Sequence, residues 1–268
     1  MRALTKTVAV LAAGFLATTA LAQSQVGMIE LDGSIAARHS VLGLGGVFAQ
    51  TTLSDILGAI EKARNDAKIK GVVIRLKDVE LDTATVEELG AAIDRLRASG
   101  KKAHLYAEEY STPQMVLGSH CDEIILQTGG EVSLPGVYME EMFLADAFKW
   151  VGATPDFVQV GDYKGASEMY ANAKPSPQWD QNINALLDGL YGQVRKQIGT
   201  GRKLSDKQLD EAMEKAWMAD GKTAKAAGLI DVECDLPDLS DHLESVYGKD
   251  FEWDDQLLLD PKEAGARR

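Results

Sequence analysis

Short runs of consecutive apolar residues alternate along this chain with apolar positions spaced every three or four residues. The continuous runs predict strands, because a strand buried in a parallel sheet carries apolar side chains on both faces. These runs lie at residues 26–31, 72–76, 103–106, 123–126 and 157–160. The regular spacing, as in Leu53, Ile56 and Ile60, predicts amphipathic helices between the strands. Such alternation predicts an α/β fold with a largely parallel sheet.

Local signals mark the ends of the expected helices. Thr85, with Glu88 three residues later, predicts a capping box at the start of one helix, and Gly100 is expected to end it. Further helices are expected at 53–63, 112–119, 140–150 and 183–194, with others opened by Ser205 and covering 224–227. The glycine-rich segment 42–46 is expected to be a loop. No linker long enough to divide the pattern is visible, so we expect one domain.

The amino-terminal residues have the pattern of a secretory signal peptide. Arg2 and Lys6 precede an uncharged apolar run at 8–19, and Ala-Leu-Ala at 20–22 fits the small-x-small cleavage pattern. The expected units are a signal peptide at 1–22, a domain at 23–250 and a loosely ordered tail at 251–268. We therefore expect an exported protein of the periplasm or cell envelope. Because the run is shorter than the roughly 20 residues of a membrane span, an uncleaved, membrane-associated segment is the alternative.

Composition narrows the classes of partner and site. The net charge of −13 is spread along the 268 residues and disfavours nucleic acid or anionic lipid as a partner. The four histidines are scattered and no Cys/His cluster has metal-ligand spacing, so we expect neither a metal site nor a cofactor. Cys121 and Cys234 could pair in an oxidising compartment, or remain two buried free thiols.

One lysine, Lys164, stands among small residues in the stretch 161–168, after the expected strand at 157–160. A lysine acts as a general base only where its surroundings lower its pKa. Burial at the end of that strand, against Tyr163, would lower the pKa of Lys164 in this way. The alternative is a solvated charge at the start of a helix, which is the usual role of an isolated lysine.

Several segments together, in the same order over nearly the whole chain after residue 22, resemble the protease IV family of bacterial signal peptide peptidases. They are 70–76, 99–102, 106–111, 122–126 with Gly136, 160–166 with Ser176-Pro177, 219–221 and 224–231. The resemblance implies a ClpP/crotonase-like fold of stacked ββα units and a serine-type peptidase with a Ser–Lys dyad. It implies that Lys164 takes the serine proton as general base, while backbone N–H groups stabilise the oxyanion. It also implies assembly into a homo-oligomer.

The chain departs from the family pattern at two places. Active members carry Ser-Gly-Gly at the start of the nucleophile helix, whereas this chain has Ser-Thr-Pro-Gln at 111–114. Thr112 is nearest the nucleophile slot and Ser111 is one residue away, and either could instead be an N-cap before the proline. Active members also carry Pro-Gly-Gly after the strand at 72–76. Here residues 77–82 contain no glycine, and their acidic side chains would oppose an oxyanion.

These features leave three functions to compare. The first is a peptidase domain, resembling the amino-terminal half of the two-domain form of the enzyme. It would supply Lys164 to a site whose serine comes from another domain or subunit, and its substrates would be apolar peptides such as cleaved signal peptides. The second is a catalytically inactive exported scaffold or binding relative, favoured by the absent glycine motifs. The third, acyl-CoA chemistry of crotonase type, is disfavoured by export and by the same missing glycines.

Overall fold

The computed structural model describes residues 24–36, 51–255 and 257, and within them the strands form one sheet. Its order is β5-β4-β3-β2-β1-β7, with β6 also pairing with β4. The strands are β1 (Gln25–Ser34), β2 (Ile69–Glu80), β3 (Lys102–Tyr110), β4 (Glu123–Val132), β5 (Ala219–Asp220), β6 (Val232–Glu233) and β7 (Glu252–Asp254). Every pairing between them is parallel except that of β4 with β5. The predicted α/β fold class with a largely parallel sheet is therefore confirmed.

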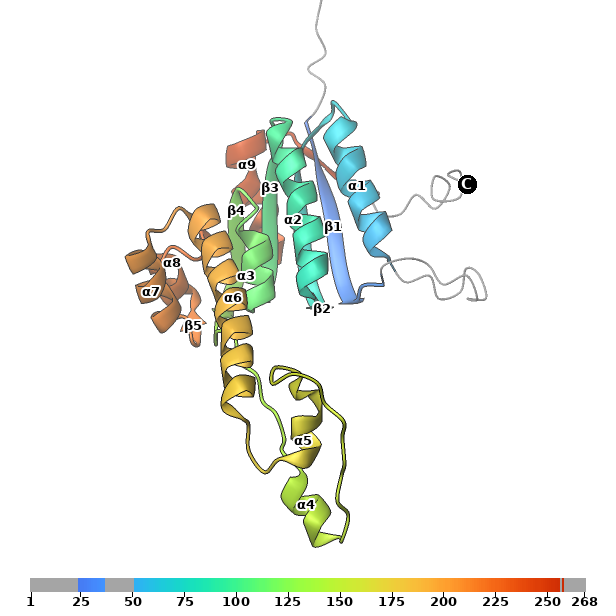
Figure 1. Cartoon of the computed structure of the whole chain (residues 1–268). Coiled ribbons are helices and arrows are strands. Elements are labelled where there is room, and N and C mark those ends of the chain that lie inside the picture. Colours follow the sequence, from blue (N-terminus) through green and yellow to red (C-terminus); the bar gives the residue numbers. More distant parts are fainter. Residues whose placement is uncertain (1–23, 37–50, 256, 258–268) are drawn as a thin grey trace, which may run out of the picture.

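Helices cover both faces of this sheet, with α1, α2 and α3 on one face and α9 on the other (Figure 1). The helices around the sheet are α1 (Leu53–Asn65), α2 (Thr83–Ala98), α3 (Thr112–Gly118), α7 (Asp206–Lys215), α8 (Gly221–Ala226) and α9 (Leu239–Tyr247), with the 3-10 helix η2 (Leu236–Asp238) before α9. Alternate residues of β2 place their side chains on opposite faces of the sheet. Val72 and Ile74 belong to the core beneath α1 and α2, whereas Val73 belongs to the core beneath α9. The sheet thus separates two apolar cores.

The two cysteines lie in different cores. Cys121 is buried in the core beneath α1 and α2, and Cys234 lies in the core beneath α9. Both are free thiols, so of the two alternatives left open by the sequence the structure contains the unpaired one. Burial raises the pKa of Cys121 to about 12 and also raises the pKa of Cys234.

An arm, which we define as residues 135–190, projects from the body at the carboxyl ends of β1 to β4 (Figure 1). It contains α4 (Ala145–Trp150), the 3-10 helix η1 (Gly165–Ser167), α5 (Glu168–Ala171) and the first part of α6 (Pro177–Arg202). The remainder of α6 packs against the body, where Ile198 is completely buried. One long helix therefore belongs to both parts and connects the arm to the sheet domain.

The arm carries most of the large apolar side chains that are exposed in the described residues. Val158 is 100% exposed, Trp150 88% and Val160 81%. The others on the arm are Tyr138, Met139, Met142, Val151, Phe157, Tyr163, Tyr170, Leu186 and Leu190. So many exposed apolar residues in one part of a chain are typical of an interaction surface.

Three local predictions are wrong. Residues 157–160 form no strand, because the described part of the arm offers no neighbouring strand for them to pair with. Helix α4 begins at Ala145 rather than at residue 140. The cap of α2 is Asp82, whose carboxylate accepts the Thr85 backbone N–H at 2.7 Å, so Thr85 lies inside the helix instead of capping it.

The predicted signal peptide at 1–22 and the predicted loop at 42–46 lie outside the described residues. The sheet reaches beyond the domain boundary predicted at residue 250, because β7 pairs in parallel with β1. Within the described ranges, no helix combines enough length with enough apolar character to cross a membrane.

Candidate functional site

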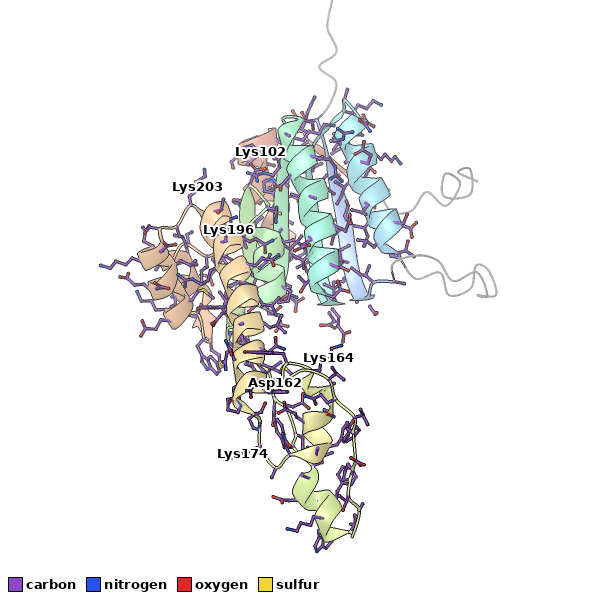
Figure 2. All side chains as sticks on the ribbon, viewed as in Figure 1. Lys102, Asp162, Lys164, Lys174, Lys196 and Lys203 are labelled. Atoms are coloured by element: carbon purple, nitrogen blue, oxygen red, sulfur yellow. The ribbon has the colours of Figure 1, made fainter. Side chains whose placement is uncertain are left out.

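Lys164 lies on the arm, in the loop between α4 and η1 (Figure 2). Gly161 forms the preceding turn with φ of +91°, a conformation that favours glycine, and its carbonyl accepts the Lys164 backbone N–H at 3.3 Å. The Lys164 side chain is exposed and borders a hollow of about 360 Å³, whose wall includes Trp179 and Ile183 of α6. The amine therefore stands beside a partly apolar hollow that is open to water.

Of the two alternatives for Lys164, burial at the end of a strand and a solvated charge, the single chain contains the solvated charge. No strand precedes it, and Tyr163, which was expected to shield the amine, is 57% exposed. The Tyr163 hydroxyl instead donates to the side-chain carbonyl of Gln181 on α6, at 2.8 Å. Dehydration of the Lys164 amine therefore requires another surface to cover the hollow.

A buried carboxylate, Glu168, holds the segment that follows Lys164. It is 7% exposed and accepts three hydrogen bonds, from the Ser176 backbone N–H at 2.9 Å, the Ser176 hydroxyl at 2.8 Å and the Asn172 side-chain amide at 3.2 Å. The Ser176 hydroxyl also accepts the backbone N–H of Trp179, which caps α6. These bonds tie α5 to the start of α6 and so fix the base of the loop that carries Lys164.

Sequence reasoning does not identify Glu168 as part of this arrangement. Two signals were present: Glu168 is the one carboxylate between Lys164 and Ser176, and Ser176-Pro177 marks a helix start. Only the fold shows that the loop closes so that the carboxylate meets the cap.

Ser111 and Thr112, the residues nearest the predicted nucleophile slot, begin α3. Ser111 is the N-cap, and its backbone N–H donates to the Gln114 side-chain carbonyl at 2.7 Å. The Thr112 hydroxyl is buried and has no hydrogen-bond partner within the described residues. Thr112 lines a hollow of about 300 Å³ that shares no residue with the hollow beside Lys164. In a single chain, Lys164 and Thr112 therefore face different hollows.

Carboxylates gather at the carboxyl ends of the central strands, where parallel sheets commonly build their sites. The acidic residues that line this crevice of about 620 Å³ are Asp32, Asp78, Glu108, Glu109 and Glu131. Arg75 and Lys77 also line it, and Glu30 forms ion pairs with both, at 2.6 and 3.3 Å, while Lys77 also lies 3.8 Å from Asp32. Burial by itself would raise the pKa of Glu30, but the hydrogen bonds from Arg75 and Lys77 outweigh it, and the pKa is lowered. The lining of the crevice, which we call the acidic crevice, is therefore net negative.

The acidic crevice includes the segment where active relatives would have oxyanion-binding glycines. β2 continues to Glu80, so residues 77–80 extend the strand and form no open loop of glycine amides. A developing negative charge near Asp78 would meet like charge, so this edge is poorly suited to binding an oxyanion. No group of His, Cys, Asp and Glu side chains among the described residues is arranged to hold a metal ion.

The sequence profile of Peptidase family S49 matches residues 95–246. The chain is 27% identical to "Protease 4" of Haemophilus influenzae over an alignment of 271 residues that covers 91% of this chain and 44% of that protein. It thus spans less than half the length of this relative.

Two solved structures resemble the chain more distantly. A mutant of the 1510-N membrane-bound stomatin-specific protease has a TM-score of 0.47 and 12% identity, covering 90% of this chain and 100% of that chain. An enoyl-CoA hydratase/isomerase family protein from Silicibacter pomeroyi has a TM-score of 0.41 and 14% identity, covering 78% of this chain and 72% of that chain. At these scores neither likeness supports an argument about function.

Proposed function

The chain belongs to Peptidase family S49, and we propose that it supplies Lys164 as the general base of a serine peptidase site completed by another subunit or homologous domain. The serine of this Ser–Lys dyad comes from the partner. That partner is either a homologous domain with Ser-Gly-Gly at its nucleophile helix or a second copy of this chain, through Ser111 or, with a threonine hydroxyl in place of serine, Thr112. The substrates in this proposal are apolar peptides, such as signal peptides after their release from exported proteins.

The observation that most supports a shared site is the position of Lys164 on an arm with an apolar surface. In the single chain the amine is open to water, and Val158 and Val160, which precede it by six and four residues, are 100% and 81% exposed. A partner that buries these side chains would also cover the hollow beside Lys164 and remove water from it. Docking of the arm would then do two things at once: favour the neutral amine and bring a hydroxyl to it.

The chemistry of such a site requires the amine of Lys164 to be neutral at the start. As the serine oxygen bonds to the carbonyl carbon of the peptide, the amine accepts the hydroxyl proton. The resulting ammonium then donates this proton to the leaving nitrogen as the peptide C–N bond breaks. Water, with its proton taken by the amine, hydrolyses the acyl-enzyme and regenerates the serine. Glu168 does not touch the reacting atoms in this scheme, and its part is to position the loop.

The experiment is to purify the full chain alone and mixed with a serine-bearing homologue from the same organism, and to measure cleavage of a fluorogenic signal-peptide-like substrate. Lys164→Ala removes the base, and Lys174→Ala is a matched control on the same arm (Figure 2). Activity that requires the mixture, is lost in Lys164→Ala and survives in Lys174→Ala supports the proposal. If the chain is active alone, its association state must be measured as well. If it belongs to the monomer and is lost in Ser111→Ala or Thr112→Ala, the dyad is self-contained and the shared site is wrong.

The second candidate function is a catalytically inactive scaffold or binding relative in the same family. The observation that favours it is the acidic crevice, because Asp78, Glu108 and Glu109 oppose the negative charge that peptide hydrolysis develops. Absence of cleavage by every combination of the chain and its homologue would favour this function over the first.

We also propose that the protein acts in the cell envelope, on the basis of the signal-peptide pattern at 1–22. Cell fractionation followed by amino-terminal sequencing tests this proposal. A mature amino terminus at Gln23 in the periplasmic fraction would support export with cleavage. An intact amino terminus in the membrane fraction would support an uncleaved anchor, and an intact one in the cytoplasm would contradict export.

A further inference from the structure

The first turn of α3 separates two hollows of opposite character. Thr112, Pro113 and Val116 line the apolar hollow of about 300 Å³ described above, whereas Gln114 lines the acidic crevice of about 620 Å³. Because Thr112, Pro113 and Gln114 are consecutive residues of one helix, the two hollows are neighbours. A single extended ligand that crosses the start of α3 would therefore meet both.

The smaller hollow, which we call the apolar pocket, has walls from three helices and the arm. Its apolar lining residues are Val86, Val116, Val137, Tyr138, Leu190 and Val194. Glu87 of α2 and Gln193 of α6, which also line it, are joined by a hydrogen bond of 2.5 Å that connects the two helices. Thr112 also belongs to the lining, and its hydroxyl is shielded from solvent and has no hydrogen-bond partner among the described residues.

In the acidic crevice, Asp32 lies 3.8 Å from the Lys77 amine, but the other four carboxylates have no such partner in the part of the chain that the structure describes. Within the described residues, Asp78, Glu108, Glu109 and Glu131 form no ion pair. Glu109 and Glu131 are also register partners on the neighbouring strands β3 and β4. Like charges placed opposite each other on adjacent strands destabilise a sheet, and a bound cation would turn this repulsion into attraction.

We propose that the apolar pocket and the acidic crevice together bind a peptide in which an apolar side chain lies close to a lysine or arginine. The apolar side chain occupies the pocket, the cation occupies the crevice, and the peptide backbone crosses the start of α3 near Thr112. The inference rests on the proposed function, because it specifies the peptides that the site receives. Signal peptides have this composition, with a positively charged region beside an apolar one.

The test is the binding of a dye-labelled peptide, Lys-Lys-Leu-Leu-Ala-Leu-Ala-Leu, to the full chain, followed by fluorescence anisotropy at low salt. A second peptide has glutamine in place of both lysines. The crevice variant combines Glu109→Gln with Glu131→Gln, and its control combines Glu88→Gln with Glu214→Gln, two exposed carboxylates on α2 and α7. The pocket variant is Leu190→Gln, at a position that is already 38% exposed.

We expect the crevice variant to bind the lysine peptide about tenfold more weakly and the glutamine peptide unchanged. The control variant should bind both peptides as the unmodified chain does, and Leu190→Gln should weaken both. Added salt should weaken the lysine peptide more than the glutamine peptide. The melting temperature of each variant shows whether a loss of binding comes from misfolding. We expect no fall in melting temperature for the crevice variant, because it removes a repulsion between carboxylates.

Equal affinity of the unmodified chain for the two peptides would overturn the inference, as would an equal loss in the crevice and control variants. A different outcome is displacement of the peptide by lauric acid with the same inhibition constant from the unmodified chain and from the crevice variant. That result would instead assign the apolar pocket to an acyl chain. Binding is measured here without cleavage. Selective binding of the lysine peptide without any hydrolysis would therefore contradict only the proposed function. Cleavage without selectivity for the lysine peptide would contradict only this inference.

Discussion

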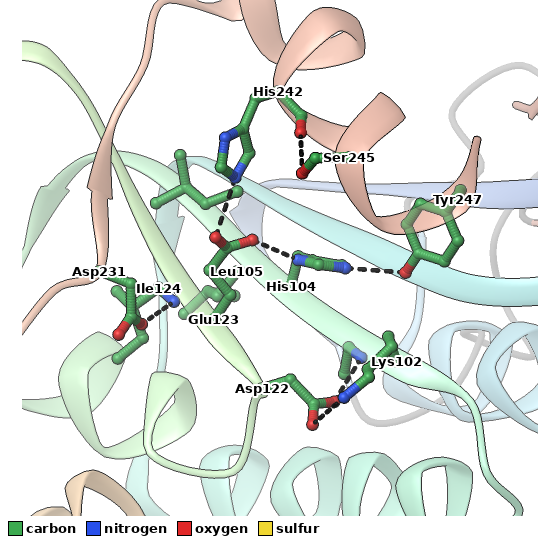
Figure 3. Close-up of polar contacts among 12 residues, drawn as sticks. Lys102, His104, Leu105, Asp122, Glu123, Ile124, Asp231, His242, Ser245 and Tyr247 are labelled. Carbon is green, nitrogen blue, oxygen red and sulfur yellow. Dashed lines mark hydrogen bonds and ion pairs between the residues drawn. The ribbon is translucent and has the colours of Figure 1, made fainter. Parts of the chain in front are cut away.

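The Nδ1 atom of His104 lies 2.7 Å from a carboxylate oxygen of Glu123 at the start of the neighbouring strand (Figure 3). The other ring nitrogen of His104 lies 2.7 Å from the Tyr247 hydroxyl, and Nε2 of His242 lies 2.9 Å from the second oxygen of Glu123. These groups are satisfied together when Tyr247 donates to His104 and both histidines donate to Glu123. Because His242 and Tyr247 belong to α9, the network fastens this helix to β3 and β4.

This network predicts a specific sensitivity to acid. Burial by itself would raise the pKa of Glu123, but the hydrogen bonds from His104 and His242 outweigh it, and the pKa lies below its ordinary value of 4.5. The charged carboxylate therefore stabilises the fold above pH 4.5, and its contribution is lost as the pH falls through the lowered pKa. Glu123→Gln should cost about 1–3 kcal/mol at pH 7 and much less in strong acid. Urea unfolding of both proteins across this pH range measures the difference, and a gap that is constant with pH would contradict the assignment.

Gly71 allows the Tyr247 hydroxyl to sit directly over β2. A Cβ atom at position 71 would lie 1.9 Å from that hydroxyl and 2.9 Å from the Lys102 backbone carbonyl. Gly71→Ala should therefore destabilise the chain by about 1–3 kcal/mol, as overpacking commonly does. The matched control is Gly58→Ala on α1, where a Cβ atom would meet no atom of the described residues beyond its own helix backbone within 4 Å, and the higher helix propensity of alanine should stabilise instead. Thermal unfolding separates the two, and equal effects in both variants would refute the contact.

In the proposed shared site, Glu168 should matter for the rate of peptide cleavage more than for the stability of the sheet domain. Its hydrogen bonds join α5 to the Ser176 cap inside the arm, away from both apolar cores. Glu168→Ala should lower kcat about tenfold or more with little change in KM, because the Lys164 loop loses its fixed position. Glu140→Ala, an exposed carboxylate on the same arm, is the control. Full activity of Glu168→Ala would show that the loop needs no such support.

The exposed valines of the arm should be needed for assembly and not for folding. Val158 and Val160 are 100% and 81% exposed, so charged replacements there remove little packing within the chain. Val158→Asp with Val160→Asp should leave the melting temperature unchanged and abolish association, because a buried unpaired carboxylate strongly disfavours an interface. Sedimentation velocity measures the association state. Val246→Asp on α9, at a valine that is 44% exposed, is the control. Loss of association in the control as well would remove the arm from this role.

Hydrophobic patterning was sufficient to predict the strands whose neighbouring strands and covering helices belong to the same chain. The apolar run at 72–76 became the centre of β2, because neighbouring strands and both cores lie in the same chain. The run at 157–160 has similar apolar content, yet it is an exposed segment of the arm. Periodicity measures the apolar content of a segment and carries no information on what covers it. The same limit explains the expected helix from residue 140, whose first residues are irregular.

The sequence singles out Lys164 as a candidate, and its catalytic role stays a prediction, whereas its surroundings could not be predicted. The Gly-Asp-Tyr-Lys-Gly segment identifies Lys164, but the exposure of its amine depends on an arm whose geometry no local pattern encodes. The absence of glycine after β2 was visible in the sequence. Two other features depend on how distant segments fold together. They are the convergence of carboxylates from four strands at that edge and the hydrogen bond between Glu168 and Ser176.

The placement of one thiol on each side of the sheet makes this fold indifferent to redox conditions. An oxidant cannot join Cys121 to Cys234 while the strands lie between them, and the high pKa of Cys121 keeps it from forming the thiolate that exchange reactions need. The chain should therefore reach the same melting temperature with and without a reductant. We therefore expect its folding to need no disulfide-forming enzyme.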